Sequence, residues 1–235
     1  MSQPDGTHKL EIGKALIGCL SAVVVACISG SVALATNWDK VQKLVSQMTP
    51  SDTLYKEEFT SADTGWDQYE DVAGNLTEYS QGTYRIFVNE PVVDIIGTPG
   101  VSYKDVSIKV SSQYLAGPED NTFGIVCRFQ DVDNYYEFLI STDGYYGIGK
   151  MVGGEFAWLG NEQMLASEFI HTGSKTNQMQ AVCKKDTLSL SVNGHQLLKV
   201  QDTDLSSAGD FGLIVGSFEE TGVDISFDHL TVTKP

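Results

Sequence analysis

Residues 122–152 read TFGIVCRFQDVDNYYEFLISTDGYYGIGKMV, and this stretch decides the fold. Apolar residues alternate with other residues in it, which is the two-residue period of a half-buried β-strand. The alternation divides into three runs, at 122–130, 134–141 and 144–152. The pair Asp143-Gly144, which is typical of a tight hairpin turn, stands between the last two. The stretch therefore predicts three consecutive antiparallel strands.

The same alternation recurs on both sides of this stretch. Further predicted strands lie at 83–88, 106–112, 178–184, 187–193, 211–217 and 223–232. Turn pairs stand beside them at Gly153-Gly154, Asn193-Gly194 and Ala208-Gly209. No helical pattern interrupts the series, and many short strands with turn signals favour a sandwich. Residues 55–235 are therefore predicted to form one all-β domain, an antiparallel sandwich of two sheets.

The N-terminal part has a different character. After a short tail at 1–14, residues 15–36 read ALIGCLSAVVVACISGSVALAT and carry no charge. An apolar helix of this length reaches across a bilayer core of about 30 Å, so we predict a transmembrane signal anchor. Two alternatives stay open. Ala33-Leu34-Ala35 fits the cleavage site of a signal peptide, and Cys27 ends a sequence similar to a lipoprotein signal.

Residues 37–54 are predicted to form a juxtamembrane helix and linker. Apolar residues follow helical spacing there, and Pro50 ends the pattern. The segment is interpreted as a plain stalk; the alternative is a helix that associates with itself or with lipid. Together with the anchor, it predicts a single-pass protein of the cell membrane whose C-terminal domain is extracytoplasmic.

The charge is concentrated in the C-terminal part. The chain has a net charge of −16, and residues 55–235 contain 11 basic and 27 acidic residues. A domain this acidic repels phosphate backbones, so nucleic acid is excluded as a partner. The membrane, through the N-terminal helix, is the predicted partner, and a homo-oligomer or a membrane partner protein stays open.

Two cysteines fall inside the predicted sandwich. Cys127 and Cys183 lie on the apolar sides of their strands, where an exported protein could oxidise them. We predict a Cys127–Cys183 disulfide. The alternative is a pair of reduced thiols in the core.

Several phrases resemble the concanavalin A-like jelly rolls of lectins and glucanases. They are the FTSADTGW opening at 59–66, the CRFQDVDNYYEF segment at 127–138, the LSLSVNG hairpin at 188–194 and the FDHLTV closing strand at 227–232. The resemblance covers residues 55–235 and is closest to the laminin-G-like and keto-disaccharide-hydrolase-like branch of bacterial surface proteins. It implies a jelly roll outside the cytoplasm. Because this fold serves lectins, enzymes and structural modules alike, it does not decide the function.

No catalytic motif is recognisable. Glucanases of this fold class carry carboxylates at alternate positions of one strand, as E-x-D-x-x-E, so that two acids flank one glycosidic bond. Here Glu137 stands in mid-strand with Tyr135 and Leu139 at the alternate positions. It is interpreted as an isolated strand acid. Acidic pairs at 131 and 133 and at 202 and 204 fall in predicted turns. We therefore assign no catalytic residue and leave open an enzyme whose carboxylates come from different strands.

Metal and ligand sites are predicted as follows. No cofactor is required by the sequence. Related sandwiches often hold a structural ion between their first and last strands, which suggests Ca²⁺ at Asp228, Glu57 and Glu58, since calcium prefers oxygen ligands. Aromatic residues on consecutive strands could form a platform for sugar rings. These residues are Tyr135, Tyr136, Tyr145, Tyr146 and Trp158.

Three functions compete at this stage. The first is a non-catalytic module that binds a polysaccharide or cell-surface glycan through surface aromatics. The second is a structural or adhesive surface protein that assembles with itself or with a protein partner. The third is a glycoside hydrolase-like enzyme. Coplanar exposed aromatics would favour the first, an open sheet edge or apolar patch the second, and facing carboxylates in a cleft the third.

Overall fold

The structure is a computed structural model that describes residues 52–235. The predicted tail at 1–14, the anchor at 15–36 and residues 37–51 of the stalk lie outside the described residues. Asp52–Pro235 forms one compact unit in which every regular element is a β-strand. Within this unit, no helix has the length and hydropathy needed to span a membrane.

The unit contains 17 strands. They are β1 (Thr53–Glu57), β2 (Tyr69–Glu70), β3 (Leu76–Ser80), β4 (Thr83–Val88), β5 (Asp94–Gly97), β6 (Ser102–Tyr103), β7 (Val106–Ala116), β8 (Asn121–Asp131), β9 (Asn134–Ile140), β10 (Tyr145–Val152), β11 (Glu155–Trp158), β12 (Leu165–Ala166), β13 (Asn177–Lys184), β14 (Thr187–Val192), β15 (His195–Gln201), β16 (Gly209–Ser217) and β17 (Val223–Thr233).

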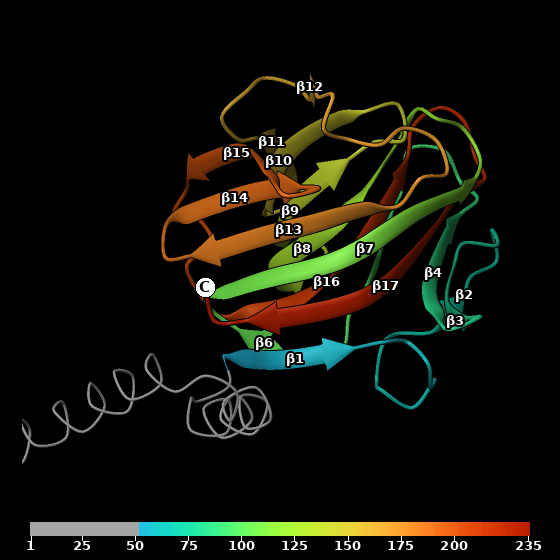
Figure 1. Cartoon of the computed structure of the whole chain (residues 1–235), viewed down its shortest axis with the longest axis horizontal. Helices are drawn as coiled ribbons and strands as arrows, with labels where there is room; N and C mark the ends of the chain where they lie inside the picture. Colours follow the sequence, from blue (N-terminus) through green and yellow to red (C-terminus); the bar gives the residue numbers. More distant parts are fainter. Residues whose placement is uncertain (1–51) are drawn as a thin grey trace, which may run out of the picture. The chain divides into compact units, whose positions relative to one another are not determined.

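The strands build two antiparallel sheets that pack face to face. Sheet A has the order β15-β14-β13-β7-β17-β4-β3-β2, with β1 paired to β17. Sheet B has the order β11-β10-β9-β8-β16-β5, with β12 paired to β10 and β6 paired to β16. Figure 1 shows β13, β7 and β17 of sheet A in front of β8, β9 and β16 of sheet B. The predicted two-sheet sandwich is confirmed.

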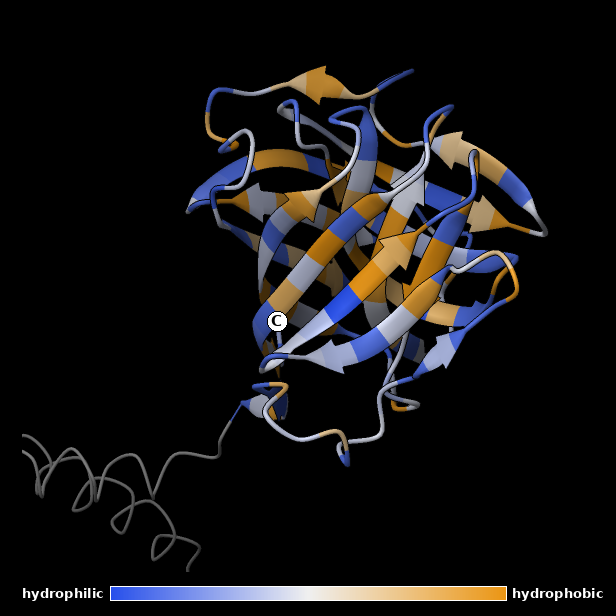
Figure 2. Cartoon of the chain, turned by 90° about the vertical axis from the view of Figure 1, so that its right-hand side faces the viewer, coloured by the Kyte–Doolittle hydropathy of each residue, from blue (hydrophilic) through white to orange (hydrophobic). Residues whose placement is uncertain are grey.

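Alternation along each strand places the core between the sheets. In β4, Tyr84, Ile86 and Val88 are fully buried while their neighbours are partly exposed. Figure 2 shows the same alternation of hydrophobic and hydrophilic residues along several strands. The prediction missed strands that lack this signal. β15 is one of them, because it lies at the edge of sheet A and has no buried residue to impose the period.

Two turn pairs form the hairpins that their sequences predict. Asn193 and Gly194, between β14 and β15, both have positive φ, of 51° and 86°. Gly153 and Gly154, between β10 and β11, have φ of 59° and 79°. Positive φ at both central positions is the requirement of a type I′ turn, which explains the residues found there.

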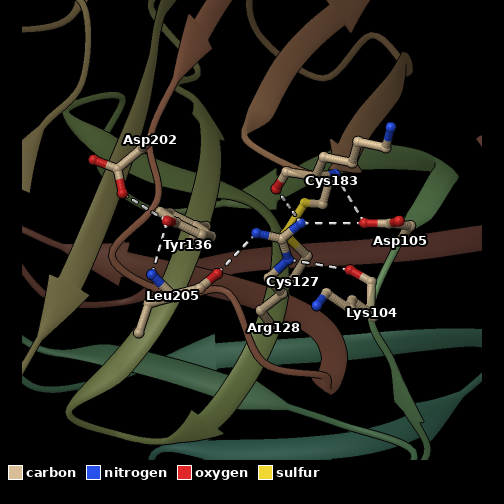
Figure 3. The surroundings of a disulfide bond; sticks show 9 residues. Lys104, Asp105, Cys127, Arg128, Tyr136, Cys183, Asp202 and Leu205 are labelled. Atoms are coloured by element: carbon tan, nitrogen blue, oxygen red, sulfur yellow. Dashed lines mark hydrogen bonds and ion pairs between the residues drawn. A yellow bond between two sulfur atoms is a disulfide. The ribbon is translucent and has the colours of Figure 1, made fainter.

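A disulfide joins the two sheets, as predicted. Cys127 of β8 and Cys183 of β13 are bonded, and both are fully buried in the core. Next to it, the fully buried Arg128 binds three loops, as Figure 3 shows. Its guanidinium donates hydrogen bonds to the carbonyl oxygens of Lys104, Lys185 and Leu205, at 3.1, 2.6 and 2.8 Å. Arg128 therefore satisfies carbonyl groups that the strands leave unpaired.

Candidate functional site

The outer face of sheet B carries the candidate site. Along β9, Tyr136, Phe138 and Ile140 point into the main core, so the residues between them point to the other side. There Tyr135 and Leu139 join a second, smaller apolar cluster with Val126 and Ile214. Glu137 lies between Tyr135 and Leu139 on this same face. An acidic side chain is therefore surrounded by apolar residues on the outside of the sandwich.

A pocket of about 220 Å³ opens above Glu137. It is smaller than the usual range for drug-sized ligands, which begins at about 300 Å³. Its lining comes from β8 and β9, from the β10–β11 hairpin, and from β5 and β16 with the segments beside them. The lining residues are Val92, Val93, Asp94, Thr122, Glu137, Leu139, Met151, Phe156, Trp158, Ser217 and Phe218.

Two aromatic rings form one wall. Phe156 and Trp158 of β11 pack edge to face, with ring centroids 4.9 Å apart. They lie over β10, in which every second residue from Gly147 to Gly149 is a glycine. A Cβ on Gly147 would come within 2.6 Å of the Trp158 ring. A Cβ on Gly149 would come within 2.6 Å of Phe156 and 2.8 Å of Glu137 Oε1. The Gly-Ile-Gly sequence therefore leaves room for the two rings and the carboxyl group.

Glu137 has an unusual environment. Its side chain is 3% exposed, and within residues 52–235 no donor forms a hydrogen bond to it. Burial, followed by the charge of Asp94, raises the pKa of Glu137 to about 8. Asp94 stands at the exposed rim of the pocket, and the protein around its carboxyl still raises the pKa of Asp94 to about 6 through desolvation. Glu137 is thus protonated at neutral pH, and Asp94 is mainly ionised.

This environment makes a stability prediction. The folded chain holds the Glu137 proton up to about pH 8, whereas the unfolded chain releases it near the ordinary glutamate pKa. Folded-state stability therefore falls as pH rises between these two values. Glu137→Gln removes the free-energy cost of ionising this buried carboxyl group at high pH. We expect it to raise the Tm by about 10 °C or more at about pH 9 and to leave the Tm unchanged at about pH 4. Calorimetry at both pH values checks this, and an equal shift at both would contradict it.

The structure separates the aromatic residues predicted to bind a ligand. Trp158 lines the pocket above Glu137. Tyr145 is 41% exposed and lines a second pocket of about 330 Å³, which shares Phe218 with the first. Tyr135 is buried within the outer cluster, and Tyr146 packs partly buried against the core.

Tyr136 requires a correction. Its ring is fully buried between the sheets, so it presents no face on which a sugar could stack. Its hydroxyl donates to Asp202 Oδ1 at 2.6 Å and accepts from the Leu205 N–H at 3.0 Å. Figure 3 shows this ring beside Arg128. Strand alternation explains why Tyr136 is buried, because one of two adjacent tyrosines in a strand must face the core.

Sequence reasoning missed Phe156 and Asp94, and it left Glu137 as an isolated acid. Asp94 opens a four-residue strand with too few residues to show a period. The pairing of β5 with β16 is long-range and brings Asp94 to the same face as Glu137. A signal was present in the sequence: one acid in an apolar strand, followed by two alternating glycines that leave space beside it.

The predicted metal residues are brought together only in part. Glu58, Asp228 and His229 offer ligand atoms that lie within 4.8 Å of one another. The His229 Nδ1 atom is 2.7 Å from Glu58 Oε2 and 3.2 Å from Asp228 Oδ1. Lys56 also contacts Glu58 at 2.7 Å, and the Lys56 and His229 contacts lower the pKa of Glu58. A set of ligands that includes a histidine nitrogen suits transition metals better than calcium. The calcium site stays a prediction.

Glu57 does not belong to this cluster. It is buried, and its Oε1 atom accepts hydrogen bonds from the backbone N–H groups of Glu58 and Phe59, at 2.9 and 2.7 Å. Phe59 has a positive φ of 50°, so the Glu57 carboxylate stabilises a tight turn at the end of β1. Its predicted role as a metal ligand is replaced by this structural one.

Comparison with known proteins identifies the architecture. Carbohydrate-binding module CBM66 from Bacillus subtilis superimposes with a TM-score of 0.56 at 15% identity, over 75% of this chain and 99% of that one. A Bacillus subtilis protein of unknown function with a galectin-like fold gives 0.57 at 11% identity, over 77% and 96%. The domain has the concanavalin A-like jelly-roll fold.

A third solved structure with the same fold is an enzyme. The Bacillus licheniformis β-glucanase gives a TM-score of 0.57 at 12% identity, over 77% of this chain and 98% of that one. No family model matches the chain, and no curated protein matches it. Identities this low establish the fold alone, so the function must be argued from the site.

Proposed function

We propose that the domain is a glycan-binding module and that its ligand occupies the pocket above Glu137. The observation that carries the proposal is the meeting, in one pocket, of the aromatic pair Phe156 and Trp158 with two carboxyl groups. Apolar ring faces pack against the C–H faces of sugars, and a few placed polar groups fix the hydroxyls. The structural likeness to the carbohydrate-binding module CBM66 supports the proposal.

The aromatic pair and the two carboxyl groups would contact different parts of the sugar. The exposed Phe156 and the half-buried Trp158 would cover one side of a sugar ring. The protonated Glu137 can donate as well as accept a hydrogen bond, while the ionised Asp94 accepts. Thr122 adds a hydroxyl group to the lining, whereas the Ser217 hydroxyl already donates to the Glu90 carbonyl oxygen. A pocket of this composition distinguishes sugars by the positions of their hydroxyl groups.

Trp158→Ala is expected to weaken glycan binding about tenfold or more, because it removes the larger of the two stacking rings. The measurement is a glycan-array screen of the full-length chain in mild detergent, followed by titration calorimetry with the best ligand. Tyr69→Ala is the matched control, since Tyr69 is an exposed aromatic residue of β2 that lies outside the pocket. Tyr145→Ala tests the second pocket. Full binding by Trp158→Ala with loss in Tyr145→Ala would refute the assignment.

Glycoside hydrolysis is the second candidate, because the pocket holds a protonated and an ionised carboxyl group together. Burial that keeps one acid protonated at neutral pH is the property of a general acid, and Asp94 would be its partner. The bound glycan is incubated with the protein, and products are analysed by mass spectrometry. Cleavage that Glu137→Gln abolishes while binding persists would move the function from binding to hydrolysis.

We also propose that the domain is extracytoplasmic and held at the membrane by residues 15–36. The uncharged length of that segment and the buried Cys127–Cys183 disulfide support this placement, since disulfides persist in oxidising compartments. Protease treatment of intact cells should digest the domain. A domain that is protected in intact cells and digested only after lysis would reject this placement.

A further inference from the structure

The ionisable groups that line the pocket above Glu137 are all acidic. Among its lining residues, the only ionisable side chains are Asp94 and Glu137, and both are acids. Neither of the chain's two arginines is free to serve the pocket. Arg128 is buried against backbone carbonyls beside the disulfide, and Arg85 pairs with Asp224 and Glu78 on sheet A. A ligand with a carboxylate or sulfate group would find no counter-charge here.

The buried carboxyl group of Glu137 has no hydrogen-bond partner among residues 52–235. Buried side-chain oxygens in residues 52–235 all have a hydrogen-bond partner unless solvent reaches them. Glu137 receives no hydrogen bond in this part of the chain, so its oxygens must border the pocket. A carboxyl group that borders a pocket without a hydrogen bond from the protein is available to a ligand that displaces water from it.

We infer that the pocket recognises a protonated amine, and that the glycan bound is a polymer of amino sugars such as glucosamine. This inference rests on the proposed function. An ammonium group would donate to Glu137, offset one negative charge of the Glu137–Asp94 pair and lie against the rings of Phe156 and Trp158. The excess of acidic residues over 55–235 would attract such a polycation over a longer range.

Binding should release a proton. The free pocket holds Glu137 protonated, and an adjacent ammonium group favours the carboxylate, so the proton passes to the buffer on binding. The titratable groups facing Glu137 are Asp94 and Tyr135. Burial, with smaller contributions from Glu137 and Asp94, raises the pKa of Tyr135, so Tyr135 stays neutral throughout. At slightly acid pH Asp94, with its pKa of about 6, is still partly protonated and can release part of a proton as well. The share of the release that belongs to Glu137 is the share that Glu137→Gln removes.

The test compares oligosaccharides of equal length by titration calorimetry of the full-length chain at slightly acid pH, where the sugar amines hold protons. The probes are oligomers of glucosamine, N-acetylglucosamine, glucose and galacturonic acid. We expect glucosamine oligomers to bind at least about tenfold more tightly than the N-acetylated ones, and the uronic acid oligomer not to bind. Titrations in two buffers of different ionisation enthalpy should show release of about one proton from Glu137 and a fraction of one from Asp94, for the glucosamine oligomer only.

Glu137→Gln should remove the preference and most of the proton release, because the amide cannot ionise and only the part from Asp94 remains. Glu155→Gln is the matched control: Glu155 is exposed on β11, the strand of the aromatic pair, lies outside the pocket and undergoes the same change from carboxyl to amide. We expect it to keep both effects within about twofold. Asp94→Asn, at the pocket rim, provides a second variant and should weaken the preference.

Three outcomes would overturn the inference. These are equal affinity for amino and N-acetylated oligomers, binding without proton release, and equal effects of Glu137→Gln and Glu155→Gln, which would indicate general attraction between opposite charges. If neutral oligomers then bind in a manner sensitive to Trp158→Ala, the glycan-binding proposal stands without the amine. Failure of every oligosaccharide to bind would reject the glycan-binding proposal itself.

Discussion

Arg128→Met is expected to lower the free energy of unfolding by about 3–5 kcal/mol. Arg128 is fully buried, and its guanidinium donates to three carbonyl oxygens of separate loops and lies 3.3 Å from Asp105. Methionine fills similar volume but donates nothing, so these oxygens become buried acceptors without a donor. Urea denaturation of the full-length chain in mild detergent, followed by tryptophan fluorescence, measures the change.

The chain supplies a matched control in its only other arginine. Arg85 lies on the outer side of sheet A, where its side chain is 26% exposed and contacts Asp224 and Glu78. These ion pairs are partly exposed and screened by solvent, so Arg85→Met should lower the free energy of unfolding by about 2 kcal/mol, less than Arg128→Met does. Arg128→Lys keeps the charge but cannot reach three carbonyls, and it should fall between the two. Equal losses from Arg85→Met and Arg128→Met would show that burial of the guanidinium is unimportant.

Removal of the disulfide is the second large effect. The double variant Cys127→Ala/Cys183→Ala should lower the free energy of unfolding by about 4 kcal/mol, because the bond closes a loop of 56 residues and restricts the unfolded chain. It also joins the two sheets at a fully buried point in the core. The double variant avoids leaving one reactive thiol in the core.

The measurement is urea denaturation with and without reductant. The unmodified chain should approach the stability of the double variant once reductant is present, whereas the double variant should not respond. A stability that is the same for both proteins under oxidising conditions would contradict the prediction. Glycan binding should persist in the double variant below its unfolding midpoint, since the disulfide lies on the core side of β8 and the pocket on the outer side of sheet B.

The sequence was sufficient for the elements whose period is set by burial. The run at 83–88 predicts β4 with its observed bounds, and 187–193 predicts β14 to within one residue. Cys127 and Cys183 could be placed on the core side from alternation alone. Such predictions succeed because a strand with one buried face repeats its apolar residues every two positions, and that repeat is visible locally.

The partners of each strand were decided only by the tertiary structure. β5 lies next to β16, which is more than a hundred residues later, and this pairing brings Asp94 to the pocket that contains Glu137. Alternation states that Tyr135 and Tyr136 face opposite sides, but not which side is the core. The choice depends on where the second sheet packs, and that is a property of the whole chain. The acid that appears isolated in the sequence therefore becomes part of a site only when distant strands meet.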